Sequence, residues 1–393
     1  MAKWIVKHLD HSGAVIDEFK PINLDFTLAI DEADDISYDV PLADPQVQWF
    51  TTVGPKRTDF LLERDGQVIT AGIHSYAASK RGSELANVQG KSWLWYLQNR
   101  HYPYNAQDPN RWLGGDLLPY RNNLIRKPNL GYQAYDHPGK IITDLLDVTL
   151  SRPESLQGIH YSLPNAGPKV FFSIQLADTE TIFDKIKQLS DMGTSGEGQD
   201  GGFHFRINPD KEFKIYFPSR YPKDARTNPG SCIWTFDDIV PPTEIVEAEF
   251  QNNGPEMTHI LANGSGTAIR NPYRSLGDHQ TPGVFRRWDG TASWSDVQDA
   301  KQLTSLAQMH YSAAMYPAIT LPIKIMPHAI PGFWDTFKPG LAVWVNLDFE
   351  VRRVTEGFKI NTMHCVVDSE GNEQVDLNVE QIMPLGFVGI NMG

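Results

Sequence analysis

The stretch TDFLLERDGQVITAGIHSY, residues 58–76, carries the clearest structural signal in the chain. Phe60 and Leu62 occupy alternating positions, as in a strand that buries one face. The pair Asp65 and Gly66 tolerates the positive φ angles of a tight two-residue turn, and apolar residues return directly after it. The stretch therefore predicts a β-hairpin.

The segment after this hairpin predicts one more strand and a short helix. Leu85 to Gln89 have strand character, and Gly90 is expected to interrupt them. The hydroxyl of Ser92 is placed to cap a helix from Trp93 to Arg100. Its large side chains can bury apolar area on both sides, so we expect this helix to plug the open end of a small barrel. Those side chains are Trp93, Trp95, Tyr96 and Leu97.

The N-terminal region continues the β pattern and predicts a barrel-like domain over residues 1–105. Residues 4–19 read as an opening hairpin, and residues 24–30 and 36–42 alternate between apolar and polar positions. With the first hairpin, these runs predict about six strands. Asp44 followed by Pro45 predicts the start of a short helix, with Asp44 as its cap.

The middle of the chain predicts an arm and a small α+β domain. Residues 106–136 are rich in proline and aromatic side chains, and we expect them to form an arm that packs on this chain or on a neighbouring subunit. Residues 137–240 predict two amphipathic helices, the first from about Pro138 and the second capped by Asp178 or Thr179. A mobile loop is expected between Gly193 and Gly202, before a hairpin over residues 203–217.

Residues 241–393 predict a second barrel-like domain with an embedded helix. Strands are expected at 244–250, 257–262, 319–325, 341–347, 358–367 and 375–379. Ser295 and Gln298 form a capping box for the helix. The fold class expected is therefore mainly β with α+β parts, with two β-barrel-like domains and a small α+β domain. Both ends are β-rich with one helix each, which is consistent with a diverged internal duplication.

Length and charge narrow the classes of function. The chain has 393 residues, which predicts two or three domains, and carries 35 basic against 48 acidic side chains, a net charge of −13. This balance argues against nucleic acid or an anionic membrane as a bound partner, although an acidic wall would let DNA slide past. Cys232 and Cys365 are far apart and predict buried thiols. The N-terminus lacks a signal peptide core, and no apolar run could span a bilayer.

Familiar catalytic patterns are missing from the sequence. It contains no H-E-x-x-H, no phosphate-binding G-x-x-x-x-G-K-[ST] and no G-x-S-x-G. The histidines are not spaced as metal ligands, so no metal, cofactor or catalytic residue is predicted. Paired carboxylates are expected to be solvated, with a glycosidase pair as the alternative. The pairs are Asp34 with Asp35, Asp237 with Asp238, and Glu247 with Glu249. The candidate interface residues are Tyr102, Trp112, Tyr120, Arg286, Arg287 and Trp288, because arginine and aromatic side chains anchor protein interfaces.

Several blocks, taken in order, resemble minor tail proteins of long-tailed bacteriophages, the siphophages. A first strand with tryptophan precedes residues 58–76 and then VQGKSWLWYLQNR, residues 88–100. Later come WSDVQDAKQLTSLAQMHYSAAMYPAITLPIKI, residues 294–325, and PGFWDTFKPGLAVWV, residues 331–345. In the resembling proteins a strand that ends in glycine leads into a helix, and a Pro-Gly turn introduces a barrel strand. The order of the blocks carries the resemblance.

The resemblance implies a structural virion protein, the baseplate hub at the tip of a non-contractile tail. Such a hub has two tail-tube-like β-barrel domains plus a small α+β domain. It forms a homotrimer whose six barrels continue the tail tube and line the DNA-exit channel. Its implied partners are the distal tail protein, the tail tube and tape measure, and other tail-tip proteins, while phage DNA passes without specific binding. It would be made in the host cytoplasm, with no membrane insertion by this chain. Many such proteins carry a C-terminal hydrolase or receptor-binding module, and because the sequence ends at Gly393 we expect neither role.

Two other functions stay open from the sequence. The first is a tail-tip glycosidase or peptidase that acts on the cell wall. The second is a tail protein that binds host carbohydrate through exposed tryptophan and tyrosine faces. The resemblance favours the structural hub over both.

Overall fold

The structure is a computed structural model of the chain. The described residues are 2–10, 12–43, 56–80, 82–101, 130–151, 156–165, 169–175, 180–192, 203–216, 225–237, 244–251, 259–264, 273–277, 289–294, 303–304, 306–307, 310–311, 319–350 and 352–382. Within them, no helix is long and apolar enough to cross a membrane.

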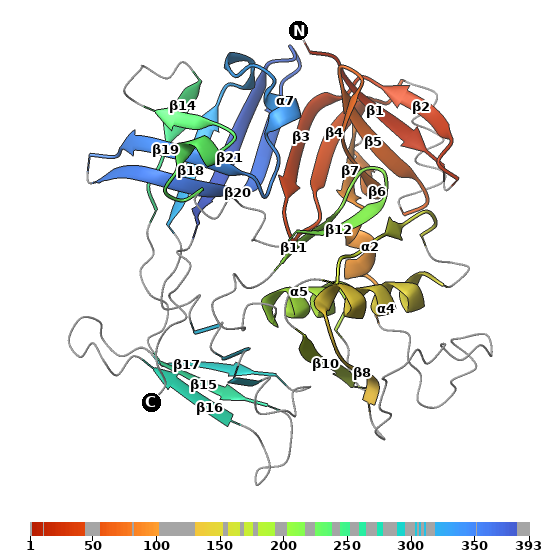
Figure 1. The fold of residues 1–393 in the computed structure, drawn as a ribbon. Helices are drawn as coiled ribbons and strands as arrows, with labels where there is room; N and C mark the ends of the chain where they lie inside the picture. The colour runs from red at the N-terminus through yellow and green to blue at the C-terminus, as the bar shows by residue number, and fades with distance from the viewer. Residues whose placement is uncertain are drawn as a thin grey trace.

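The N-terminal strands form a curved antiparallel sheet, which lies at the upper right of Figure 1. They pair in the order β3-β4-β7-β6-β5-β1-β2. The predicted hairpin is β5 with β6, and its turn residues Asp65 and Gly66 have φ angles of 50° and 84°, as a tight two-residue turn requires. The strands are β1 (Trp4–Leu9), β2 (Val15–Phe19), β3 (Ile22–Ala29), β4 (Asp35–Pro41), β5 (Asp59–Arg64), β6 (Gln67–Ser79) and β7 (Leu85–Ser92).

The C-terminal strands form a second curved sheet, at the upper left of Figure 1. They pair in the order β14-β18-β21-β20-β19-β13. The strands are β13 (Thr235–Asp237), β14 (Ile245–Ala248), β18 (Thr320–Ile325), β19 (Ala342–Asp348), β20 (Arg353–Val367) and β21 (Glu373–Gln381). A 3-10 turn η3 (Pro327–Ala329) and the short helix α7 (Phe333–Thr336) connect β18 to β19.

One strand joins these two halves into a single sheet of 13 strands. Residues 353–359 of β20 pair with β19, and residues 362–367 of the same strand pair with β3. The register of β20 against β21 shifts between Ile360 and Thr362, where the neighbour on the other edge changes. A β-bulge bends a strand and increases its twist, so this one turns β20 from one half toward the other. The mainly β expectation is confirmed, and the two barrel-like units share one sheet and one buried core.

The two halves repeat one pairing pattern. In the first half β3 pairs with β4, β4 with β7, β7 with β6 and β6 with β5, all antiparallel. In the second half β14, β18, β21, β20 and β19 pair in the same sequence, again antiparallel. The long strands β6 and β20 also share a register shift, which β6 has against β7 and β20 has against β21. This agreement supports an internal duplication, which the sequence raised and the strand pairing makes visible.

Two inserts interrupt the repeated pattern, and both lie below the paired halves in Figure 1. The first, between β7 and β13, contains α2 (Leu94–Gln98), β8 (Leu130–Asp136), α4 (Pro138–Leu150), β9 (His160–Tyr161), β10 (Val170–Gln175), α5 (Ile182–Met192), β11 (His204–Ile207), β12 (Glu212–Tyr216) and the 3-10 turn η2 (Pro229–Ser231). The second, between β14 and β18, contains β15 (His259–Asn263), β16 (Tyr273–Gly277) and β17 (Asp289–Ser293). Side chains of both inserts meet in a second buried core.

The aromatic helix α2 differs from its prediction in three ways. Strand β7 continues through Gly90 to Ser92. The glycine is needed for packing, because a Cβ on Gly90 would lie 2.5 Å from the Phe60 ring. The helix begins at Leu94 without a side-chain cap, and the Ser92 hydroxyl instead accepts a hydrogen bond from the amide of Asp34. The helix packs in the second core between the end of the first half and the first insert, with Trp93 buried and Trp95 half-buried.

The amphipathic helices of the first insert agree with the sequence, except for one cap. The apolar face of α4 is fully buried through Ile141, Ile142, Leu145 and Leu146. The cap of α5 is Thr181, because its hydroxyl accepts from the Asp184 amide while the Asp184 carboxylate accepts from the Thr181 amide. The sequence placed this cap at Asp178 or Thr179. The predicted helix at Asp44–Pro45, the loop 193–202 and the capping box at Ser295 lie outside the described residues.

Strand pairing does not follow the expected division of the chain at residue 241. Strand β13 precedes residue 241 and yet pairs with β19 of the second half. Strands β15, β16 and β17 follow residue 241, but they form a separate sheet. Within the expected arm, residues 130–136 form strand β8, with Tyr132 buried and Tyr135 63% exposed. A contiguous stretch of sequence is therefore a poor guide to the sheet it joins.

The two tryptophans of the α2 region give a matched pair of substitutions. Trp93→Ala should cost about 3–5 kcal/mol of unfolding free energy, because Trp93 is 1% exposed and its removal leaves a cavity in the second core. Trp95→Ala should cost less, about 1–2 kcal/mol, since Trp95 is only partly buried at the edge of the same core. Urea denaturation of both variants measures the difference. Equal losses would contradict the placement of the helix.

Candidate functional site at the junction of the two halves

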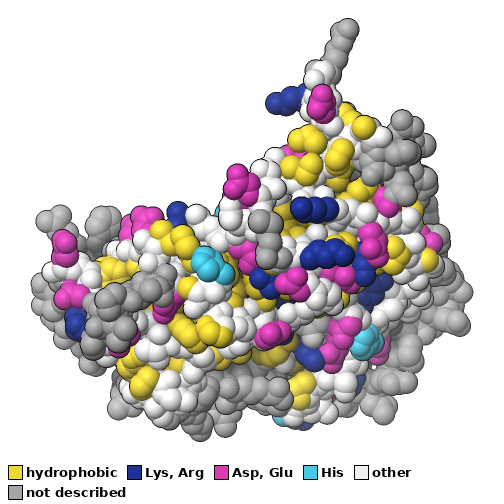
Figure 2. Space-filling view, turned by 90° about the horizontal axis from the view of Figure 1, so that it is seen from above, with side chains coloured by type: hydrophobic (Ala, Val, Ile, Leu, Met, Phe, Trp, Pro, Cys, Tyr) yellow, Lys and Arg dark blue, Asp and Glu magenta, His cyan; other side chains and the backbone are white. Residues whose placement is uncertain are grey.

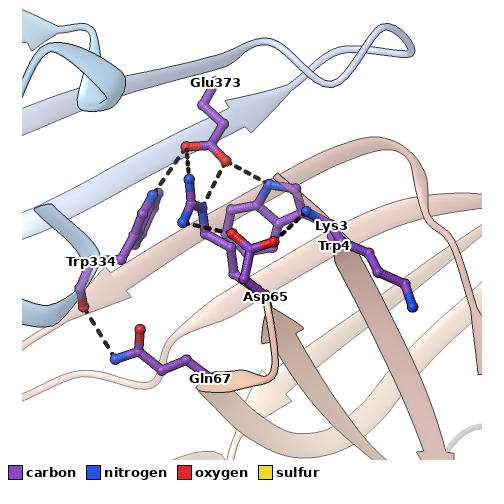
Figure 3. A network of polar contacts seen from close by, with 7 residues as sticks. Lys3, Trp4, Asp65, Gln67, Trp334 and Glu373 are labelled. Carbon is purple, nitrogen blue, oxygen red and sulfur yellow. Dashed lines mark hydrogen bonds and ion pairs between the residues drawn. The ribbon is translucent and has the colours of Figure 1, made fainter. Parts of the chain in front are cut away.

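A buried carboxylate holds the upper end of the junction together (Figure 3). Glu373 begins β21, and its side chain is only 6% exposed. One carboxylate oxygen, Oε1, accepts from the indole nitrogen of Trp4 at 2.9 Å and from Nε of Arg64 at 2.8 Å. Its other oxygen accepts from the indole of Trp334 at 3.0 Å and from Nη2 of Arg64 at 3.3 Å. Four donors from three separate segments therefore converge on one side chain of the second half.

The rings around Glu373 exclude water from this contact. The Trp4 and Trp334 rings meet edge to face with centroids 5.4 Å apart, and Phe26 packs 5.4 Å from Trp4. The Arg64 guanidinium lies 5.9 Å from the Trp4 ring and 5.8 Å from the Trp334 ring, within cation–π range. Because Trp334 belongs to α7 and the others to the first half, the cluster fastens the two halves by packing and by charge together.

The lower end of the junction is fastened by a second polar group. Asp31, just after β3, accepts the amide of Phe205 at 2.7 Å and contacts Nδ1 of His204 at 2.5 Å. The other ring nitrogen of His204 lies 3.4 Å from Nζ of Lys359 in β20. Asp31 comes from the first half, His204 from the first insert and Lys359 from the second half. This group therefore joins three parts of the molecule at one point.

The turn between β3 and β4 is fixed by a buried aspartate. The Asp34 carboxylate accepts from the amide of Ala29 at 3.0 Å and from the hydroxyl of Thr70 at 2.7 Å. Its own backbone exchanges hydrogen bonds with Ser92, which ties the turn to the end of β7. Burial raises the pKa of the Asp34 carboxyl above its usual value. The bonds make this side chain a brace for the end of β3 at the junction.

A chain of polar side chains runs through the interior of the first half. Nε2 of His8 lies 2.6 Å from the Tyr38 hydroxyl, which lies 3.0 Å from Nε2 of His74. Nδ1 of His74 is 2.9 Å from the Thr58 hydroxyl. Burial lowers the pKa of His8 to about 3 and that of His74 well below its usual value, with His8 adding to the second effect. Both imidazoles are therefore neutral near pH 7, which suits a hydrogen-bonded chain inside a core.

The described residues give little support to a catalytic or metal centre. Across those ranges, no group of three histidine, cysteine or acidic side chains could hold a metal ion. His259 pairs with Asp289, and His364 lies between Asp25 and Asp376. Of the carboxylates considered for a glycosidase, Asp34 is the buried brace described above and Asp35 pairs with Lys91. Each of these side chains is engaged in local hydrogen bonds or ion pairs.

The surface seen from above carries acidic, basic and apolar side chains that are interspersed (Figure 2). The six predicted interface residues, which are Tyr102, Trp112, Tyr120, Arg286, Arg287 and Trp288, all lie outside the described residues, and their role stays a prediction. The sequence did not indicate Glu373, because it follows the exposed turn 368–372 and its partners lie 39 to 369 residues away.

Comparisons with known proteins identify the fold. No family model matches the chain, and no curated protein is significantly similar to it in sequence. The tail protein from Neisseria meningitidis MC58 superposes with a TM-score of 0.61 at 13% identity, over 96% of both chains. The 43 kDa tail protein of prophage MuSo2 from Shewanella oneidensis gives 0.62 at 12% identity, over 98% of this chain and 99% of that one.

A third structure with this fold belongs to a larger chain. A chain of the Francisella PdpA–VgrG complex superposes with a TM-score of 0.51 at 9% identity, over 97% of this chain and 53% of that one. This chain therefore spans about half of that neighbour. At these identities the likeness concerns the fold: the chain has the fold of phage tail proteins.

Removing Glu373 should loosen the junction. Glu373→Ala removes the acceptor of two indole N–H groups and of Nε of Arg64, which keeps its contact with Asp65 through Nη1. The unsatisfied donors should cost about 3–5 kcal/mol of unfolding free energy. The matched control is Glu370→Ala in the neighbouring exposed turn, which should change stability by about 0.5 kcal/mol or less. Chemical denaturation measures both variants, and a loss below about 1 kcal/mol for Glu373→Ala would show that the contact contributes little.

Acid should destabilise the first half through its buried histidines. The unfolded chain binds protons near pH 6.5, whereas His8 in the folded chain does so near pH 3, so stability is full above pH 6.5 and falls as the pH drops toward 3. For His8 alone the loss at pH 5 is about 2 kcal/mol. Melting temperatures from pH 7 to pH 4 measure this slope. The double variant His8→Gln, His74→Gln should flatten it, whereas the exposed control His160→Gln should not.

Proposed function

We propose that this chain is a structural protein of a phage tail, the hub that joins the tail tube to the tip of a non-contractile tail. The observation that carries the proposal is the agreement over nearly the full length with solved tail proteins, with TM-scores of 0.61 and 0.62. The resemblance of residues 58–100 and 294–345 to minor tail proteins supports it independently of the superposition.

The contacts at the junction fit a structural role better than a catalytic one. The two halves share one sheet and one core, and polar contacts fasten both ends of the seam between β3 and β20. An enzyme would need reactive groups that converge in a cleft. The acids and histidines discussed above instead form hydrogen bonds and ion pairs that hold neighbouring segments together. We therefore favour a structural role over a cell-wall glycosidase or peptidase, and over a carbohydrate-binding tip protein.

The proposed assembly is a homotrimer. Two similar halves in each chain would give three copies six similar units, which suits a tube of sixfold symmetry. The proposed division is an N-terminal unit over 1–105, an arm over 106–136, an α+β unit over 137–240 and a second unit over 241–393, with β13 added to the second sheet. Proposed partners are the distal tail protein, the tail tube, the tape measure and other tail-tip proteins.

The proposed channel would carry DNA without binding it. The net charge of −13 repels phosphates, so contact would be passive. The proposed place of the protein is the tail tip of the virion.

Imaging of intact tails tests the hub proposal. We expect density for this chain next to the tip, in three copies around the tail axis. Absence of the chain from purified virions, or a position along the shaft of the tail, would overturn the assignment. A zymogram on host peptidoglycan tests the enzyme alternative: the purified chain should leave the substrate uncleared. Clearing that is lost on substitution of a carboxylate would replace the structural reading.

A further inference from the structure

Strands β20 and β3 pair with each other, but the strands that correspond to them in the repeated pattern have open edges among the described residues. In that pattern β6 corresponds to β20, and β14 corresponds to β3. On the β5 side of β6, pairing with β5 reaches Ile73, and no described strand pairs with residues 75–79 there. Strand β14 is an edge strand, paired only with β18 among the described strands. An open edge of this kind is a template for pairing with another chain.

The register shifts align β6 with β20 residue by residue. After its shift, β6 resumes pairing with β7 at Tyr76, and β20 resumes pairing with β21 at Thr362. Tyr76 therefore corresponds to Thr362, and four residues further Lys80 corresponds to Val366. Ala77 packs against the buried core, as its counterpart Met363 does, so the inward and outward faces of the two strands also agree.

The rest of the pattern aligns β14 with β3. In the first half Tyr76 lies opposite Gln89, Gln89 opposite Ser37 and Ser37 opposite Asp25. In the second half the same steps lead from Thr362 through Asn378 and Pro322 to Glu249, whose amide donates to the Pro322 carbonyl at 3.0 Å. Glu249 therefore corresponds to Asp25.

We propose that β6 of one copy pairs with the β14 edge of a second copy of this chain, in the register by which β20 pairs with β3. Within the chain, Val366 lies opposite Asp25. The corresponding pair between copies is Lys80 opposite Glu249, both exposed on the single chain. The proposal rests on the assembly of copies proposed above, and it names the surface through which they meet.

Charge supports this choice of partner. Strand β14 contains Glu247 and is flanked by Glu244 and Glu249, whereas β6 is followed by Lys80 and, in the sequence, by Arg81. In an acidic chain, copies repel one another, so a contact needs local pairing of opposite charges. The two edges differ from each other, so the contact is head to tail, and identical contacts close into a ring when the rotation permits.

Disulfide trapping tests the register. Ala78 should lie opposite Gln251 of the second copy, at the 4.5–5.5 Å Cβ separation typical of opposed strand residues, so the variant Ala78→Cys, Gln251→Cys should give interchain disulfides under mild oxidation. Each single variant, and the double variant Ala77→Cys, Gln251→Cys, which is one residue out of register, should give little. Absence of cross-linked product from concentrated protein, or an equal yield from the out-of-register pair, overturns the proposal.

Charge reversal tests the ion pair on the intact chain. Lys80→Glu and Glu249→Lys should each weaken association in sedimentation by about tenfold, and the double reversal should restore it. The matched controls Lys20→Glu and Glu370→Lys change the same charges at exposed sites elsewhere and should leave association unchanged. If copies assemble into a ring but neither the disulfide trapping nor the charge reversals have the expected effect, this junction is refuted while the tail function stands. If the junction forms but the chain is absent from virions, the tail function falls and the junction stands.

Discussion

Backbone pairing between β20 and β3 is the constraint on which the rest of the structure depends. These strands are about 340 residues apart in sequence, and their hydrogen bonds make one sheet out of two similar units. The edge of β20 serves two neighbours in turn, β19 and then β3, and the register shift near Ile360 allows the change of direction. This pairing places Trp334 and Glu373 of the second half against Trp4 of the first half.

The inserts depend on the same seam. Asp31 follows β3 directly and binds His204 and the amide of Phe205, so the first insert docks where the two halves meet. Helix α2 fills the space between the end of the first half and this insert. The second insert separates β14 from β18 in sequence, yet its Ala262 reaches the same buried core. The duplicated sheets thus form the frame, and the inserts cover one side of it.

The sequence predicted local structure well because local patterns decide it. The Asp65–Gly66 turn, the alternation of Phe60 and Leu62, and the apolar face of α4 each depend on residues that are near neighbours. It did not predict the seam or Glu373, because these depend on contacts between distant segments. It also could not choose between Trp93 and Trp95, since both are large apolar side chains and only the packing of the inserts decides which is buried.

Hydrogen exchange of the backbone amides tests the central claim most directly. If β3 and β20 form one cooperative unit, their amides over residues 24–29 and 362–367 should share one high protection and should exchange together as denaturant is added. Deuterium uptake followed by mass spectrometry at rising urea concentrations would show this. Early exchange of one of the two strands while the other stays protected would show that the halves open separately, and it would contradict the account.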